Sequence, residues 1–321
     1  MQLLVYLPLL IPALAAIAAR PLAARLEPRE ATWLLTVATV VLAGCSTVAL
    51  ALLVASAAAR VPILAELRHY SQPVLRRGDP TSAVTGAVAA FVLTGAALAV
   101  AITFRYRARA LAESYRRAAR LHDDGAVVVV PGPAIEAYAM PGSPGRIVVS
   151  GRLLQSLDEA GRAALLAHER AHLAGRHHLF TTVAYLAAAA NPVLLPLARA
   201  VDYTVERWAD EHAARVTGDR RLVAATIGQV AMLATPVRRP AATTLGIVAA
   251  QSRQASARSR RISVAWAGPV PRRVAALLVP PPRTQTLLLA VAVLVLLVAG
   301  VSALQAARDL HALLELAGGP H

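Results

Sequence analysis

Two groups of residues have the types and the spacing needed to hold one metal ion. His168 and His172 are four residues apart in an H-E-x-x-H pattern, and Glu206 begins a later E-x-x-x-D pattern. Residues four apart share one face of a helix, so both imidazoles can reach a single ion. Glu206 supplies the third ligand, which leaves one position open for water, as hydrolytic zinc sites require. The sequence therefore predicts one Zn²⁺ per chain on these three residues.

Two carboxylates beside the ligands have predicted roles of their own. Glu169 is one step round the helix from the imidazoles, where it can take a proton from water but is poorly placed to bind the metal. Asp210 falls one turn after Glu206 on the same helical face, so it can accept a hydrogen bond from a ligand imidazole and fix its tautomer. His212 is a further candidate, as a donor to the transition state.

The H-E-x-x-H pattern must lie well inside a helix for its ligands to be held in place. Residues 156–159 are typical of a capping box at a helix start, and Gly175 marks the predicted end. Leu165, Leu166 and Leu173 would bury one side of that helix. The alternative interpretation is a solvated His/Glu face on an amphipathic helix, which requires neither the buried leucines nor the second motif.

A few other residues limit the chemistry further. Cys45 is the only cysteine, so a disulfide framework and a cysteine-based zinc site are both excluded. His177 and His178 follow the motif helix and are interpreted as a solvated pair or as partners of the ligands. Trp208 points to another face than Glu206 and is expected in the core.

The elements that carry these residues belong to a membrane protein. Hydrophobic residues make up 57% of the 321 residues, charged residues 16%, and the mean hydropathy is +0.54. Crossing a bilayer takes about 20 apolar residues. Four uncharged stretches are long enough: 1–19, 31–59, 81–104 and 284–307. The first could instead be a signal peptide, but nothing positive precedes its apolar core, which favours a retained span.

All formal positive charge other than histidine is carried by arginine, because the chain contains no lysine. The arginines flank the segment between the third and fourth spans, and only Arg308 follows the fourth. The positive-inside rule therefore predicts a cytoplasmic segment with both termini outside, in a cell membrane. One loop disagrees, since Arg60, Arg68, Arg76 and Arg77 would face outward. A nucleic-acid partner is not expected, because the arginines cluster beside spans without interleaved aromatic residues. The flanking arginines are Arg105, Arg107, Arg109, Arg116, Arg117, Arg120, Arg253, Arg258, Arg260, Arg261, Arg272, Arg273 and Arg283.

A fifth apolar run, 179–198, separates the two halves of the metal site. It cannot be a simple span, because one crossing would leave His172 and Glu206 on opposite sides of the membrane. The run is a buried helix, an interfacial helix, or a re-entrant hairpin turning at Asn191-Pro192. We favour a bent hairpin held close to the membrane.

The predicted fold is mainly α and integral to the membrane, with about four transmembrane helices and an α+β cytoplasmic peptidase domain. Short β-branched runs at 126–130 and 146–150, separated by Pro and Gly, predict a small sheet. An exposed edge strand there would let a substrate add itself as a strand, and the alternative is a hairpin that only supports the fold. The predicted layout is three spans in 1–104, a zinc peptidase domain in 105–240, a Pro/Arg-rich connector in 241–283, a final span in 284–307 and a tail in 308–321.

H-E-R-A-H, followed by Glu206 and Asp210 in E-R-W-A-D-E-H-A-A, resembles the gluzincin membrane peptidases of families M48 and M56. Residues 145–154 are similar to the strand and turn that precede the zinc helix in those families. Three spans before the site and one after it resemble the β-lactam sensors of M56, whereas Thr217-Gly218-Asp219 after the second motif is similar to M48. The resemblance covers roughly residues 110–240 for the peptidase.

The resemblance implies a zincin fold with His168, His172 and Glu206 on zinc, Glu169 as the base, and Asp210 orienting a ligand. Direct β-lactam sensing through acylation at an S-x-x-K serine is excluded, because the chain has no lysine. Regulatory cleavage of a partner such as a transcriptional repressor stays open.

The leading interpretation is therefore a membrane zinc metalloendopeptidase that acts on a cytoplasmic or membrane-associated protein, with the lipid bilayer as its other partner. The alternative is a non-catalytic membrane receptor or scaffold that retains a zinc site. Glu169 argues against it, because a structural site needs no base. A transporter is a third interpretation, weakened by spans that carry almost no ionisable groups. The sequence does not indicate an oligomeric state.

Overall fold

The computed structural model describes residues 6–59, 83–120, 126–234, 269–280 and 285–318. Among these residues, four helices are long and apolar enough to cross a membrane, which agrees with the four predicted spans. They are α1 (Leu7–Arg25), α2 (Pro28–Ala58), α5 (Ala83–Arg120) and α12 (Thr286–Gly318). The arginine-bearing loop between the second and third spans lies outside the described residues.

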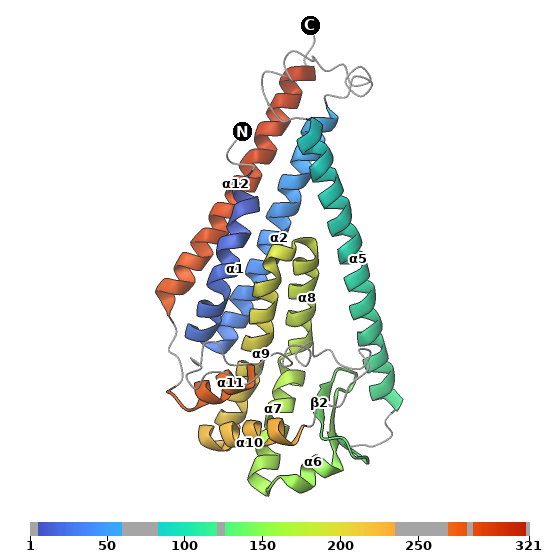
Figure 1. The fold of residues 1–321 in the computed structure, drawn as a ribbon, viewed down its shortest axis with the longest axis vertical. Helices are drawn as coiled ribbons and strands as arrows, with labels where there is room; N and C mark the ends of the chain where they lie inside the picture. The colour runs from blue at the N-terminus through green and yellow to red at the C-terminus, as the bar shows by residue number, and fades with distance from the viewer. Residues whose placement is uncertain (1–5, 60–82, 121–125, 235–268, 281–284, 319–321) are drawn as a thin grey trace, which may run out of the picture.

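A small sheet lies beside the lower end of α5 (Figure 1). It contains the two predicted strands, β1 (Val127–Val130) and β3 (Arg146–Ser150), and a third, β2 (Ala137–Met140), that the sequence analysis did not anticipate. The order is β1-β3-β2, with β1 parallel and β2 antiparallel to β3. The central strand β3 is buried through Ile147, Val148 and Val149.

The helix α7 (Glu159–Ala174) carries the H-E-x-x-H residues and packs against both β2 and β3. The predicted capping box needs a correction at its first residue. Ser156 ends the short preceding helix α6 (Gly151–Ser156), and Asp158 is the N-cap of α7, accepting a hydrogen bond from Gly161 N at 2.8 Å. Gly175 ends the helix as expected.

The apolar run after α7 forms a helical hairpin. Helix α8 (His177–Ala190) ends at Asn191, a 3-10 turn η1 (Pro192–Leu194) follows, and α9 (Leu195–Thr217) returns beside it. Helix α8 packs against α2 and α5, α9 packs against α1 and α2, and Asn191 Nδ2 donates to Ser46 Oγ at 3.0 Å. Figure 1 shows the hairpin standing beside α1 and α2, with its open end toward α7. Because the chain turns back, α9 delivers Glu206 to the level of α7.

Two further helices pack against α9 and against each other. Helix α10 (Arg220–Leu233) begins after Gly218, and α11 (Pro269–Leu277) packs against α10 and α9. Arg220 holds α11 by donating to the carbonyl oxygens of Ala276, Leu277 and Val279, at 2.9, 3.0 and 2.9 Å. Helix α11 lies in the stretch assigned to a connector from sequence, and residues 241–268 of that stretch lie outside the described residues.

Candidate metal centre

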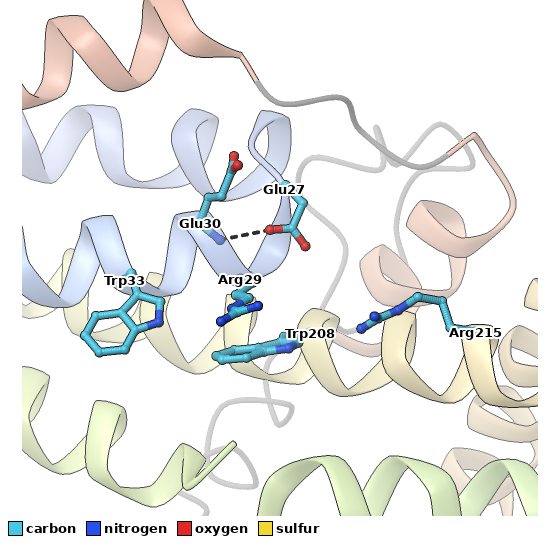
Figure 2. Close-up of a pocket in the computed structure, with 6 residues that line it drawn as sticks. All are labelled: Glu27, Arg29, Glu30, Trp33, Trp208 and Arg215. Carbon is cyan, nitrogen blue, oxygen red and sulfur yellow. Dashed lines mark hydrogen bonds between the residues drawn. The ribbon is translucent and has the colours of Figure 1, made fainter. Parts of the chain in front are cut away.

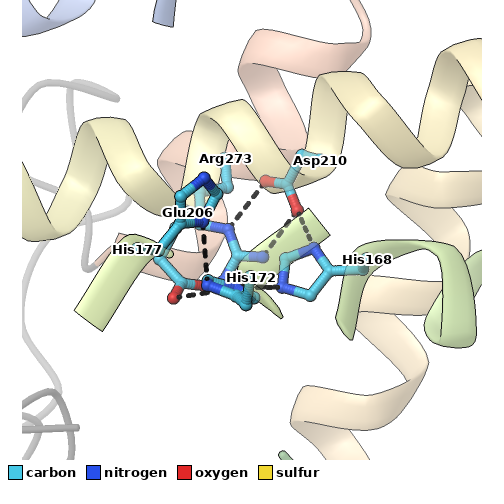
Figure 3. Close-up of polar contacts among 6 residues, drawn as sticks. All are labelled: His168, His172, His177, Glu206, Asp210 and Arg273. Atoms are coloured by element: carbon cyan, nitrogen blue, oxygen red, sulfur yellow. Dashed lines mark hydrogen bonds and ion pairs between the residues drawn. The ribbon is translucent and has the colours of Figure 1, made fainter. Parts of the chain in front are cut away.

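Side-chain atoms of His168 and His172 on α7 and of Glu206 on α9 that could bind a metal converge on one point (Figure 3). The two Nε2 atoms are 3.1 Å apart, His168 Nε2 lies 3.7 Å from Glu206 Oε2, and His172 Nε2 lies 3.6 Å from Glu206 Oε1. Zinc–ligand bonds of about 2.0–2.2 Å in a tetrahedron place neighbouring donors roughly 3.3–3.6 Å apart. The three separations, 3.1, 3.6 and 3.7 Å, differ from this range by at most about 0.2 Å, so small side-chain shifts would let the three residues hold a single ion of this size.

The two imidazoles carry different charges. Burial by itself lowers the pKa of His168, but the carboxylates of Asp210 and Glu206 outweigh it and raise that pKa to about 10. Burial lowers the pKa of His172 to about 4. The acidic neighbours thus favour a proton on His168, whereas burial favours a neutral His172, 3.1 Å away. The carboxylates of Glu206 and Asp210 therefore make this position favourable for a positive charge.

Asp210 lies behind the first of these imidazoles, as the E-x-x-x-D spacing predicts. Its Oδ1 is 3.0 Å from His168 Nδ1, an ion-pair contact rather than a well-aligned hydrogen bond. The Asp210 side chain is 2% exposed. Burial alone would raise its pKa, but Arg273 and His168 lower it, so the carboxylate stays charged. An anion in this position would hold the proton of a neutral His168 on Nδ1 and leave Nε2 free for a metal.

Arg273, on α11, is the site residue that the sequence analysis missed. Its Nη1 lies 2.8 Å from Glu206 Oε2, while its Nε and Nη2 donate to the two oxygens of Asp210 at 2.8 and 2.6 Å. Although burial acts in the opposite direction, Arg273 holds the pKa of Glu206 well below its ordinary value. One guanidinium therefore joins the carboxylate of Glu206 to that of Asp210.

Glu169 lies on the buried side of α7, facing the sheet. Its side chain accepts a hydrogen bond from the backbone N–H of Ala139 on β2, and burial raises its pKa. The edge strand and the predicted base are therefore in direct contact. His212 is half-buried on α9, and a two-residue offset turns it about 200° away from Asp210. In the described part of the chain, no hydrogen bond or ion pair joins His212 to the cluster.

A comparison with protein-family models identifies the family of the chain. The model of peptidase family M48 matches residues 101–279, which is more than half of the chain and includes α7, α9 and α11. The chain belongs to peptidase family M48. Of the two families that the motifs resemble, the comparison thus supports M48. No curated protein and no solved structure matches the chain.

In this M48 chain, a column of rings extends from the second imidazole toward the membrane helices. His177, 2% exposed, has its Nδ1 3.1 Å from His172 Nδ1. Its ring packs on Trp208 at 4.6 Å between centroids, and Arg29 lies over the Trp208 ring at 5.8 Å. Of the histidine pair considered from sequence, His177 is thus the one that contacts His172, a predicted ligand.

Trp208 was expected in the core, but it is only partly buried. It lines a pocket of about 660 Å³ between the start of α2 and α9 (Figure 2). Residues at the start of α2 and in the turn before it form one wall, and Trp208 and Arg215 on α9 form the other. The residues around the pocket are Glu27, Arg29, Glu30, Trp33, Trp208 and Arg215.

Proposed function

We propose that this M48 chain is a membrane-embedded zinc metalloendopeptidase with its catalytic face in the cytoplasm. The observation that carries the proposal is the convergence of His168, His172 and Glu206 on one point, at separations that fit one zinc ion. These three residues would hold the ion. When bound, zinc acidifies water and polarises the scissile carbonyl.

Glu169 is the residue that moves the proton in this proposal. A carboxyl group whose pKa burial has raised can accept a proton from water and return it to the leaving amine near neutral pH. Asp210 and Arg273 keep the site organised: the carboxylate orients His168, and the guanidinium keeps Glu206 charged and in place.

The edge strand β2 indicates how the substrate binds. β2 is the outer strand on the side of the sheet that contacts α7, and Ala139 in this strand already contacts Glu169. A peptide that adds to β2 in an extended conformation would pass beside the base with its backbone aligned for cleavage. The proposed substrate class is therefore an extended segment of a protein.

The arginines around the third and fourth spans support the cytoplasmic placement, and the proposed substrate is accordingly a cytoplasmic or membrane-apposed protein. Regulatory cleavage of a repressor gains no support from the family match and is not part of the proposal. A receptor or scaffold with a structural zinc site would not need a buried glutamate beside its ligands, so Glu169 favours catalysis.

The purified, zinc-loaded protein tests this proposal with Glu169→Gln. We expect the variant to keep one zinc per chain and to lose cleavage of casein, because it loses the base and keeps the ligands. Glu159→Gln is the matched control, since Glu159 is an exposed glutamate on the same helix. Full activity in Glu169→Gln, or a wild type that takes up no zinc, would contradict the proposal.

A further inference from the structure

We propose that His177 is a positioning residue that fixes the tautomer of His172 by accepting a hydrogen bond from its Nδ1. This inference rests on the proposed zinc site. The two Nδ1 atoms are 3.1 Å apart, and the His172 Nε2 atom on the other side of the ring faces Glu206 and His168. His177 thus stands behind one ligand as Asp210 stands behind the other.

The local backbone places His177 there by an unusual turn. Between α7 and α8, Arg176 adopts a left-handed conformation with φ +48°, which is strained for a residue with a side chain. A Cβ atom on Gly175 would lie 2.4 Å from His177 Nε2, so only glycine leaves room for the ring. Trp208 covers the ring from α9. The imidazole of His177 is therefore held against His172 by the left-handed turn, by the space beside Gly175 and by packing on Trp208.

The position of one proton decides whether His172 can bind metal. If Nδ1 of His172 carries the proton and donates it to His177, Nε2 has a free lone pair for the ion. If His177 donates instead, the proton of a neutral His172 sits on Nε2 and blocks coordination. The metal-competent state therefore requires His177 to be neutral, with its own proton on Nε2.

That requirement leaves a buried N–H without a partner. His177 Nε2 has no hydrogen-bond partner within the described residues, so a purely structural ring at this position would be better replaced by an apolar one. A neutral imidazole is also a weaker acceptor than the carboxylate behind His168. The hydrogen-bond acceptor behind His172 is thus weaker than the one behind His168, and the tautomer of His172 depends on His177.

The test compares zinc dissociation constants, by chelator competition, for the full-length protein in detergent. His177→Leu should weaken zinc binding by about 10–100-fold, the range found when partners of ligand imidazoles are removed. His177→Gln should recover most of that loss, because its amide oxygen can accept the same hydrogen bond. His178→Leu, the neighbouring histidine that contacts no ligand, should bind zinc as the wild type does.

Zinc binding by His177→Leu equal to that of the wild type would overturn the proposal. So would equal losses in the Leu and Gln variants, which would mean that ring packing matters and the hydrogen bond does not. Imidazole ¹⁵N chemical shifts of zinc-loaded wild type give a check that needs no variant to fold: His172 should be protonated at Nδ1, and metal on Nδ1 would refute the role. A wild type that binds no zinc would contradict the metal site itself, whereas the other outcomes concern His177 alone.

Discussion

Arg273→Met should destabilise the metal-free protein strongly. In the wild type, the guanidinium makes three contacts of 2.6–2.8 Å with Glu206 and Asp210. Asp210 is 2% exposed and cannot be rehydrated without opening the site, while Glu206 is 29% exposed and can recover part of its hydration. Removing one partner of a buried ion pair costs about 3–5 kcal/mol, and the partial exposure of Glu206 favours the lower end, about 3 kcal/mol.

The measurement is thermal unfolding in detergent with a chelator present. For a unit of this size, about 3 kcal/mol corresponds to a fall in Tm of about 6–12 °C. Arg272→Met is the matched control, because Arg272 is next in the chain and stacks on Tyr203 at 4.2 Å, a contact worth about 0.5–1 kcal/mol when exposed. Arg273→Lys should lie between wild type and Arg273→Met, because it keeps the charge and loses the two-pronged contact.

Zinc provides the second half of this test. A divalent ion beside Glu206 replaces the positive charge that the substitution removes, so zinc should raise the Tm of Arg273→Met by more than it raises that of the wild type. Equal Tm values for the Arg272 and Arg273 variants without metal would refute the role of Arg273 in joining the two carboxylates.

Three other outcomes follow from the same geometry. Zinc binding at about pH 6 should release about one proton, because His168 has a pKa of about 10 whereas that of His172 is about 4 and that of Glu206 is lowered. Zinc affinity should rise about tenfold per pH unit between about pH 5 and 6.5, and more steeply above about pH 7, where the zinc-bound water also ionises. Calorimetry in buffers of different ionisation enthalpy counts that proton, and a count of zero would be inconsistent with the charged His168. Asp210→Ala should weaken zinc binding by about 10–100-fold in chelator competition, and an unchanged affinity would argue against its orienting role. Single cysteines at Ala160 and Gly218 in a Cys45→Ser background should react with an impermeant reagent only after lysis; labelling in intact cells would place the site outside.

The sequence is most informative where structure is set by local periodicity. The four long apolar helices, the shared helical face of His168 and His172, and the spacing of Glu206 to Asp210 each follow from the pattern within one element. The meeting of Glu206 with the two histidines was inferred from the chemistry of a metal site, which needs a third ligand. The need for both halves of the site to meet also predicted that the apolar run must turn back, and the chain turns at Asn191.

The residues that the sequence did not reveal depend on contacts between distant elements. Arg273 is 63 positions from Asp210, and no periodicity links an arginine on one helix to a carboxylate on another. Strand β2 lacks β-branched residues, so its conformation comes from pairing with β3 rather than from its own propensity. His177 gains its role from the left-handed turn at Arg176, which no motif in the sequence indicates.

The central claim is that two imidazoles and one carboxylate of this chain bind zinc. X-ray absorption at the zinc edge of the purified, zinc-loaded protein tests it most directly. We predict a spectrum with scattering from two imidazole rings and first neighbours that are nitrogen and oxygen at about 2.0–2.2 Å. Glu206→Gln should lower the zinc content and alter the oxygen contribution. Zinc surrounded by oxygen alone, by a single imidazole, or absent from the wild type would contradict the account.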